Sequence, residues 1–223
     1  MKRLLPLLLS LCLLVLLSAC GLSDVVPDAP AEGEKTNDLF RYYYYSDHVE
    51  ILQYLGTDLE VTVPETLDGV PVTVIGSAAF SGGDVTGVAL PDCVTDIADN
   101  AFNGCNFMEH FRLPASLKTV GASAFSECCM IKELTFPAGF TTLSEYAFSQ
   151  CLALEKVTFE CPIIVIPSNC FSYCSLLTDV TYSAGTPAEI AEDAFLDCPV
   201  ADSSPVLSSF TDLPSLDTAD VYY

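Results

Sequence analysis

Basic residues and histidines are scarce in this sequence, and both shortages exclude classes of function. Eight lysines and arginines stand against 30 aspartates and glutamates, which gives a net charge of −22 at pH 7. A surface this negative repels phosphate backbones and anionic lipid headgroups, so nucleic-acid binding and electrostatic docking on a membrane are disfavoured. The acidity favours solubility, and it would also suit a cationic or calcium-bridged partner.

Motifs for catalysis and metal binding are missing as well. The two histidines, His48 and His110, lie far in sequence from Cys128-Cys129 and Cys170–Cys174, and neither cysteine group has the spacing of a zinc site. His110 falls at a solvent-facing strand position with no nucleophile motif around it, and the chain contains no glycine-rich phosphate loop. We therefore expect no metal, no cofactor and no enzymatic activity.

An export signal is present at the start of the chain. Lys2 and Arg3 precede an almost pure leucine run, and small residues follow it in Leu17-Ser18-Ala19-Cys20. This pattern predicts a secretory signal peptide over residues 1–19, with a retained membrane helix as the alternative. The last four residues resemble a bacterial lipobox. The resemblance implies a lipidated Cys20 that anchors the mature chain to the membrane on its extracytoplasmic side, whereas a plain secreted protein is the other reading.

Residues 20–39 then predict a lipidated N-terminus and a flexible tether. Proline, glycine, acids and small residues mix there without any hydrophobic period, which is typical of a linker. Removal of the signal peptide takes away Lys2 and Arg3, so six basic residues remain against 30 acidic ones and the net charge becomes −24.

Residues 40–71 predict an N-terminal β cap. Tyr42–Tyr45 and Val49–Tyr54 are β-prone and are separated by a turn at 46–48, which indicates a hairpin. A stacked array exposes its first core layer unless a cap covers it. The tyrosines could instead form an aromatic binding platform, but packing on the coil below is the favoured interpretation.

A repeat occupies residues 72–200. Six phenylalanines recur every 22 to 24 residues, each preceded by alanine or cysteine and, five positions earlier, by an aliphatic residue: Phe80, Phe102, Phe125, Phe148, Phe171 and Phe195. This period lies within the leucine-rich-repeat range of roughly 20 to 29 residues. It predicts a solenoid of the α/β leucine-rich-repeat type, with about six coils of about 23 residues. Short parallel strands should stack about 4.8 Å apart, with helical turns at the Ala-Phe pairs, and residues 201–223 should form an irregular tail.

The repeat pattern Ile-x-x-x-Ala-Phe-x-x-Cys-x-x-Leu-x-x-Val-x-Phe-Pro resembles the BspA-like leucine-rich repeat family of bacterial surface proteins. The resemblance covers about 42–198. It implies a surface-exposed, non-enzymatic module, with adhesion to proteins of a host or a neighbouring cell. Two departures stand at the ends: Gly83 replaces the cysteine in the first copy, and the last copy loses the pattern after Cys198.

Eleven cysteines in an exported chain raise the question of disulfides. Cys12 would leave with the signal peptide and Cys20 would carry lipid. Five of the other nine share one repeat position and should form a column: Cys105, Cys128, Cys151, Cys174 and Cys198. Free buried thiols are the favoured interpretation, and disulfides between adjacent coils are the alternative.

A stripe of polar residues on the outward side of the repeat strands is the candidate binding site. Apart from Lys118, every basic residue of the repeats falls there. The candidate residues are His110, Arg112, Lys132, Glu133, Thr135, Lys156, Thr158, Asp179 and Thr181. The hypothesis is a lipid-anchored, surface-displayed module that binds a protein or glycan partner. The alternatives are an ordinary solvated sheet face and an envelope scaffold or spacer without a dedicated ligand.

Overall fold

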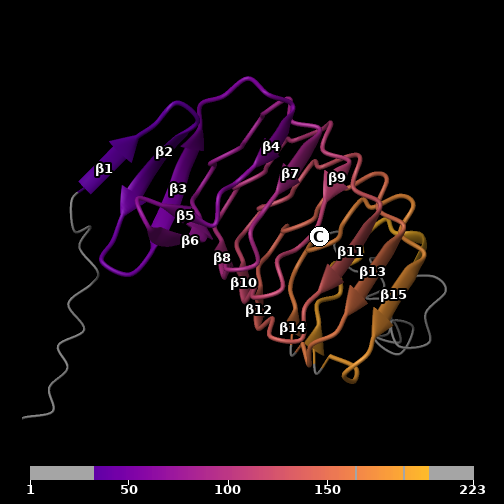
Figure 1. Cartoon of the computed structure of the whole chain (residues 1–223). Coiled ribbons are helices and arrows are strands. Elements are labelled where there is room, and N and C mark those ends of the chain that lie inside the picture. Colours follow the sequence, from indigo (N-terminus) through magenta and orange to yellow (C-terminus); the bar gives the residue numbers. More distant parts are fainter. Residues whose placement is uncertain (1–32, 164, 188, 201–223) are drawn as a thin grey trace, which may run out of the picture.

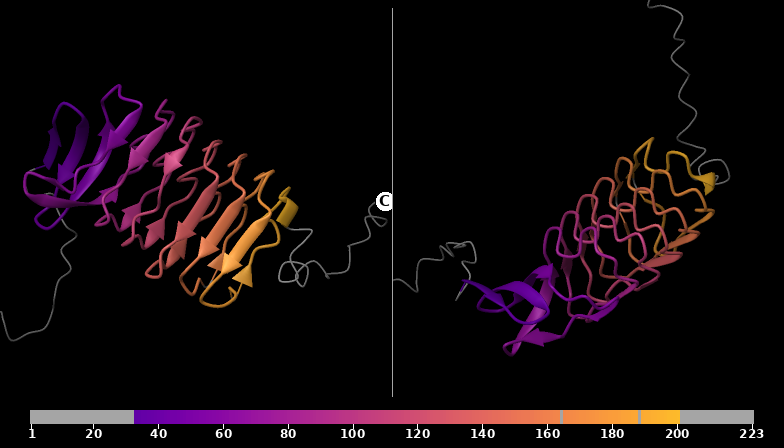
Figure 2. Two further views of the ribbon diagram at one scale, coloured as in Figure 1. Left: turned by 45° about the vertical axis from the view of Figure 1, so that its right-hand side comes forward. Right: turned by 90° about the horizontal axis from the view of Figure 1, so that it is seen from above.

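The structure, a computed structural model, describes residues 33–163, 165–187 and 189–200. The chain winds into an elongated solenoid with a β cap at its N-terminal end (Figure 1). The coils stack one behind another along the length of the molecule (Figure 2). The six aliphatic, Ala-Phe repeats of the sequence form these coils, numbered here 1 to 6 from Phe80 to Phe195. The predicted solenoid is therefore present.

The cap consists of three antiparallel strands: β1 (Gly33–Thr36), β2 (Phe40–Tyr44) and β3 (Val49–Tyr54). The predicted hairpin is confirmed in β2 and β3. Strand β1 lies inside the segment expected to be a flexible tether, so that expectation is wrong for 33–36. Pairing with the tyrosine strand orders β1, and Lys35 lies over the Tyr44 ring and contacts Asp68 at 3.1 Å. Contacts of this kind join residues that are distant in the sequence, so they produce no hydrophobic period from which the strand could be predicted.

One side of each coil carries a short parallel strand with the aliphatic residue of the repeat. We call these strands the first ladder. Strand β3 pairs in parallel with β6, which continues the cap sheet into the coils, and β5 (Thr66–Leu67) forms a small hairpin with β6. The first ladder consists of β6 (Val70–Ile75), β8 (Asp96–Ile97), β10 (Thr119–Val120) and β12 (Thr142–Leu143), followed by the separate pair β14 (Val165–Ile166) and β16 (Glu189–Ile190).

The opposite side of the coils carries a second set of strands, which we call the second ladder. Its first sheet contains β4 (Glu60–Thr62), β7 (Gly87–Ala89) and β9 (His110–Phe111). Its second sheet contains β11 (Glu133–Phe136), β13 (Lys156–Phe159) and β15 (Asp179–Tyr182). All of these pairs are parallel, as expected for strands one repeat apart.

The Ala-Phe segments are turns rather than the predicted helical turns, and none of the sixteen elements of the described residues is a helix. The backbone there bonds to the next coil as well as to itself. For example, the Phe125 N–H donates to the Ala147 carbonyl at 2.8 Å, whereas the Ser126 N–H donates to Ser123 within the same turn at 3.2 Å. An α-helix uses its N–H groups internally after the first turn. The solenoid instead uses half of them to join coils, at the cost of left-handed residues such as Ser123 (φ 53°) and Glu127 (φ 64°).

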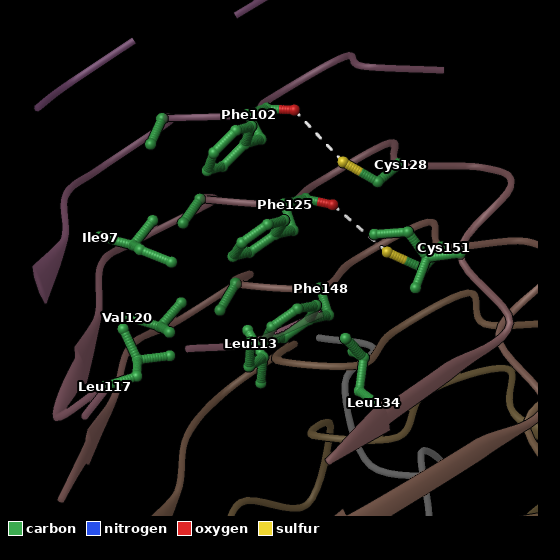
Figure 3. Close-up of a cluster of buried hydrophobic side chains, with 14 of the residues drawn as sticks. Ile97, Phe102, Leu113, Leu117, Val120, Phe125, Cys128, Leu134, Phe148 and Cys151 are labelled. Carbon is green, nitrogen blue, oxygen red and sulfur yellow. Dashed lines mark hydrogen bonds between the residues drawn. The ribbon is translucent and has the colours of Figure 1, made fainter. Parts of the chain in front are cut away.

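A column of stacked phenylalanines runs through the core. The six rings lie 5.0 to 5.5 Å apart between centroids, with interplanar angles of 4° to 15°. Tyr54 of the cap adds a further ring, 5.6 Å from Phe80. Each buried ring stabilises the fold by about 1.5–3 kcal/mol through burial, and each ring pair adds about 0.5–1.5 kcal/mol. Figure 3 shows the central rings of the column with the surrounding aliphatic residues.

The cysteine column lies beside the phenylalanines, and its thiols are free. All nine cysteines of the described residues are unpaired. The Cys151 thiol donates to the Phe125 carbonyl of the preceding coil at 3.2 Å, and Cys128 donates in the same way to Phe102 (Figure 3). Burial raises the pKa of Cys105 to about 11. Cysteine therefore serves here as a small buried side chain with a weak donor.

Gly83 interrupts this column in coil 1. The five column cysteines each donate to a phenylalanine carbonyl of the coil before them. Coil 1 follows the cap instead of another coil, and Tyr54 of the cap takes the place of that phenylalanine in the ring column.

The predicted signal peptide, the lipidation site Cys20 and the predicted tail 201–223 lie outside the described residues. Within the described part of the chain, no helix has the length and hydrophobicity needed to span a bilayer.

Candidate protein-binding surface

Most of the predicted stripe lies in two rows across β11, β13 and β15. Glu133, Lys156 and Asp179 are register partners in the first row. Thr135, Thr158 and Thr181 are register partners in the second row. Five of these six side chains are exposed and Thr158 is half-buried. They face outward because the alternate residues of each strand, such as Leu134 and Val157, are buried in the core.

His110 and Arg112 belong to the other sheet of the second ladder, so the stripe is divided. Strand β9 pairs with β7, and within the described residues no ladder joins β9 to β11. Phe111 takes the strand position that Leu134 has in the next coil, and its ring packs against Phe102 and Phe125 with centroids 5.5 and 4.9 Å apart. We attribute the break to this bulkier side chain. The prediction of one continuous stripe missed it.

Each basic residue of the stripe contacts an acidic residue of a neighbouring coil. Arg112 lies 2.8 Å from Asp92, and Lys132 lies 2.9 Å from Glu109. A third pair, Lys156 and Asp179, is 3.9 Å apart. Hydrogen bonds from Arg112 and Lys132 lower the pKa values of Asp92 and Glu109, and the bond to Glu109 raises the pKa of Lys132. These pairs are exposed, so they fix side-chain positions more than they add stability.

A groove of about 480 Å³ runs over β4, β7 and β9. Its volume is within the range of small ligand pockets, about 300–1,000 Å³. The middle strand and the residue after it form the floor with Val88, Ala89 and Leu90, of which only Ala89 is exposed. Glu60 and Thr62 form one wall, and the other wall contains Glu109, His110 and Arg112. The groove exists because the middle strand has only the Ala89 methyl group where the neighbouring strand carries Thr62.

Gly87 also sets the position of a groove carboxylate. A Cβ atom at this position would collide with the carboxylate of Glu60, which lies over the β7 backbone. The Thr86 hydroxyl donates to this carboxylate at 3.0 Å. Glu60 is therefore held across the strand toward His110, the register partner of Gly87 on the far side.

The sequence analysis missed Glu60, Thr62, Gly87 and Ala89 as surface residues of interest. A signal was available in Thr86–Leu90. Gly87 and Ala89 occupy the outward positions that hold Glu133 and Thr135 two coils later, so small residues at these positions predict a depression.

A second cavity of about 350 Å³ lies between the cap and coil 1, lined among others by Tyr54, Asp58, Phe80, Gly83 and Asp84. It opens where the column cysteine is missing. In the described residues, no group of three or more histidine, cysteine or acidic side chains is placed to hold a metal ion.

Comparisons with known proteins agree with this geometry. Residues 73–201, more than half of the chain, match six copies of the model for the BspA type leucine rich repeat region. No curated protein matches the chain. The T. pallidum leucine rich repeat protein TpLRR is 23% identical with a TM-score of 0.62, over 79% of this chain and 94% of that protein.

Two further solved structures share the fold. A leucine-rich repeat protein from Bacteroides capillosus is 27% identical with a TM-score of 0.51, over 57% of this chain and 98% of that protein. The pneumococcal vaccine antigen PcpA is 20% identical with a TM-score of 0.59, over 74% of this chain and 40% of that protein. The repeat pattern, the stacked coils and the six matched copies give one conclusion: the chain belongs to the BspA-type leucine-rich repeat family.

Proposed function

We propose that this protein is a surface-displayed recognition module that binds a protein partner through the outward face of its second ladder. The observation that carries the proposal is the groove over β4, β7 and β9, with Ala89 exposed in its floor and with polar walls. Such a groove accepts a protruding side chain of a partner, and the flanking rows of charges and threonines supply hydrogen bonds around it.

The rigid scaffold supports this function. Backbone hydrogen bonds and stacked rings hold every coil against the next, so the outward side chains keep a fixed spacing without a partner. A preorganised surface loses little conformational entropy on binding. Family membership supports the same conclusion, because open solenoid faces are used for recognition.

We further propose that lipid on Cys20 holds the module at the extracytoplasmic surface of the membrane. The order of signal peptide, small residues and cysteine supports this anchor. Replacement of Cys20 by serine should move the mature chain from the membrane fraction to the soluble fraction. Retention of the variant in the membrane fraction would contradict the anchor.

The binding proposal is tested in two steps. A photo-reactive amino acid at Thr62, in the groove wall, should crosslink the partner on intact cells, and the same group at Thr141, exposed beside the first ladder, should not. The affinity of the purified partner is then measured for the wild-type chain and for the triple variant Arg112→Glu, Lys132→Glu, Lys156→Glu. We expect a loss of about tenfold or more, since each exposed charge contributes about 0.2–1 kcal/mol and reversal adds repulsion.

Equal affinity of the triple variant, with an unchanged melting temperature, would reject the stripe. The result would then favour an envelope scaffold or spacer. The ion pairs between coils already favour that second candidate, because they give the basic residues a role within the solenoid itself.

A further inference from the structure

In the part of the chain that the structure describes, the second ladder ends at its C-terminal side in an unpaired strand edge. Among the described residues, β15 pairs with β13 and with no other strand, and it forms the outer end of its sheet (Figure 1). Asp179 and Ser183 donate their N–H groups back to coil 4, at 3.2 and 2.9 Å. Successive residues of a strand direct their N–H groups to opposite sides, so Val180 and Tyr182 direct theirs to the open side. An edge of this kind is a template for another strand.

The core columns end half-covered at the same edge. Leu134 and Val157 are buried, but Val180, the next residue of their column, is half-buried. Phe136 and Phe159 are buried in the same way, and Tyr182, stacked 5.5 Å from Phe159, is half-buried. The array itself continues to Val200, whose N–H donates to the Leu177 carbonyl at 3.0 Å. Coil 6 therefore stacks on coil 5 as far as Val200, and the last two described residues, 199–200, are helical.

The sequence of coil 6 is poorly suited to supply a strand for this edge. Residues 201–205 read Ala-Asp-Ser-Ser-Pro, without the alternating apolar side chains that would continue the columns ending at Val180 and Tyr182. A proline within a strand also lacks the N–H that strand pairing needs.

A second copy of the chain is a poor match as well. Its free strand at the N-terminal end is β4, in which Val61 is buried and Glu60 and Thr62 face outward. Pairing that keeps Val61 over Val180 would set Glu60 directly opposite Asp179. Like charges directly opposite each other destabilise a strand pair.

We propose that the β15 edge binds an extended segment of a partner protein, which adds to the sheet as a parallel strand. The columns specify its sequence. The charges of the first row alternate along Glu133, Lys156 and Asp179, so the partner segment should place a basic residue opposite Asp179. An aliphatic residue lies opposite Val180 and an aromatic residue opposite Tyr182, with a small polar residue between them. Main-chain hydrogen bonds give the affinity and the alternate side chains give the specificity. This edge is separate from the groove, so the two proposals fail independently.

The chain contains a probe for this site. The capped peptide Glu-Lys-Val-Thr-Phe-Glu, the sequence of residues 155–160, has the required order of side chains and a net negative charge. Any binding to this acidic protein is therefore not bulk charge capture. We expect saturable 1:1 binding to the full chain in detergent micelles, measured by fluorescence anisotropy. The control peptide Glu-Lys-Val-Pro-Phe-Glu lacks one donor and should bind at least about fivefold more weakly.

Two variants test whether the peptide binds at the β15 edge. Val180→Pro removes the donor that faces the open side and should lower the affinity at least about fivefold. Asp179→Lys should lower the affinity for the lysine peptide and raise the affinity for a peptide with glutamate in place of lysine. This variant keeps the test decisive if the proline variant does not fold. The paired change Arg112→Glu, Lys132→Glu should leave binding of the lysine peptide unchanged.

Three results would overturn the proposal. The first is no saturable binding, or binding that neither variant alters. The second is an affinity that rises about tenfold or more on deletion of 201–223, which would assign the edge to the chain's own C-terminal segment. The third is self-association in sedimentation experiments that Val180→Pro abolishes, which would assign the edge to a second copy.

Discussion

At the scale of single residues, the repeat contains side chains that form hydrogen bonds with the backbone of the neighbouring coil. The column cysteine is small enough for a site of zero exposure, and its thiol reaches the carbonyl of the phenylalanine one coil earlier. In coils 1 to 3 this phenylalanine carbonyl also accepts an N–H from its own turn, as Phe125 does from Cys128 at 3.2 Å. Both lone pairs are thereby used, which matters because an unsatisfied buried polar group costs about 1–3 kcal/mol.

The left-handed turn residues are a second feature of this scale, and they support a prediction. Gln150 is exposed with φ 60°, and its counterparts in coils 1 and 2 are Gly82 and Gly104, with φ 67° and 73°. Gln150→Val should lower the free energy of unfolding by about 1–3 kcal/mol, because a β-branched residue is strained there. Gln150→Gly should change it by less than about 1 kcal/mol, since relief of strain and added chain entropy offset each other. Urea denaturation checks both variants, and equal stabilities for them would contradict the backbone argument.

At the scale of strands and coils, the cross-coil ion pairs determine how the binding face responds to acid. The Arg112 guanidinium beside Asp92 lowers the pKa of that carboxyl below its ordinary value of 3.8. A lowered pKa means that the pair stabilises the folded state above the unfolded pKa and that this contribution is lost as the pH falls through the folded pKa. The face should therefore keep its arrangement at neutral pH and lose its pairs only in strong acid.

We predict that carbon-detected NMR titration will give Asp92 a midpoint below 3.8, and that Arg112→Gln will raise this midpoint. The effect should be confined to Asp92. Asp193, whose pKa is lowered by its bond to the Ser168 hydroxyl rather than by a cation, serves as the internal control and should not move. A midpoint for Asp92 that does not respond to the loss of Arg112 would contradict the pair.

The strand pattern was largely predictable from the sequence because alternating burial determines it. Leu134 and Phe136 alternate with Glu133 and Thr135, and the structure places the first two in the core and the others outside. The Ala-Phe turns were not predictable in the same way. Alanine is compatible with a helix and with a tight turn, and the choice depends on hydrogen bonds to the next coil, which only stacking creates.

The candidate site was predictable in part. Charged and threonine positions of the repeat indicated an outward stripe, and the structure places those residues on the second ladder. The groove was missed because a depression is marked by a small residue, and a search for chemically active side chains passes over Ala89. The division of the stripe depends on how Phe111 packs against two other rings, which no local pattern reports.

At the scale of the whole molecule, stability depends on contacts between neighbouring coils. The central ring of Phe125 stacks on both Phe102 and Phe148, whereas the terminal ring of Phe195 stacks on Phe171. We expect Phe125→Ala to lower the free energy of unfolding by about 3–5 kcal/mol, because two interfaces lose contacts around one cavity. Phe195→Ala should cost less.

Chemical denaturation monitored by circular dichroism measures both variants. Phe125→Ala should also separate the unfolding of the two halves of the array, since stability in a solenoid is transmitted through nearest neighbours. Equal losses for the two alanine variants would show that the ring column does not determine the cooperativity of unfolding.

Tyr54 gives the cap the same contact surface that one coil offers the next, since its ring extends the phenylalanine column and its N–H donates to the Ala79 carbonyl at 2.9 Å. The cap therefore fits any coil of this pattern, and gain or loss of a whole repeat leaves both ends intact. Each such event changes the separation of the groove from the β15 edge by one strand spacing, about 4.8 Å. Related chains with other repeat numbers would therefore present the same two surfaces at other separations, and so to partners of different length.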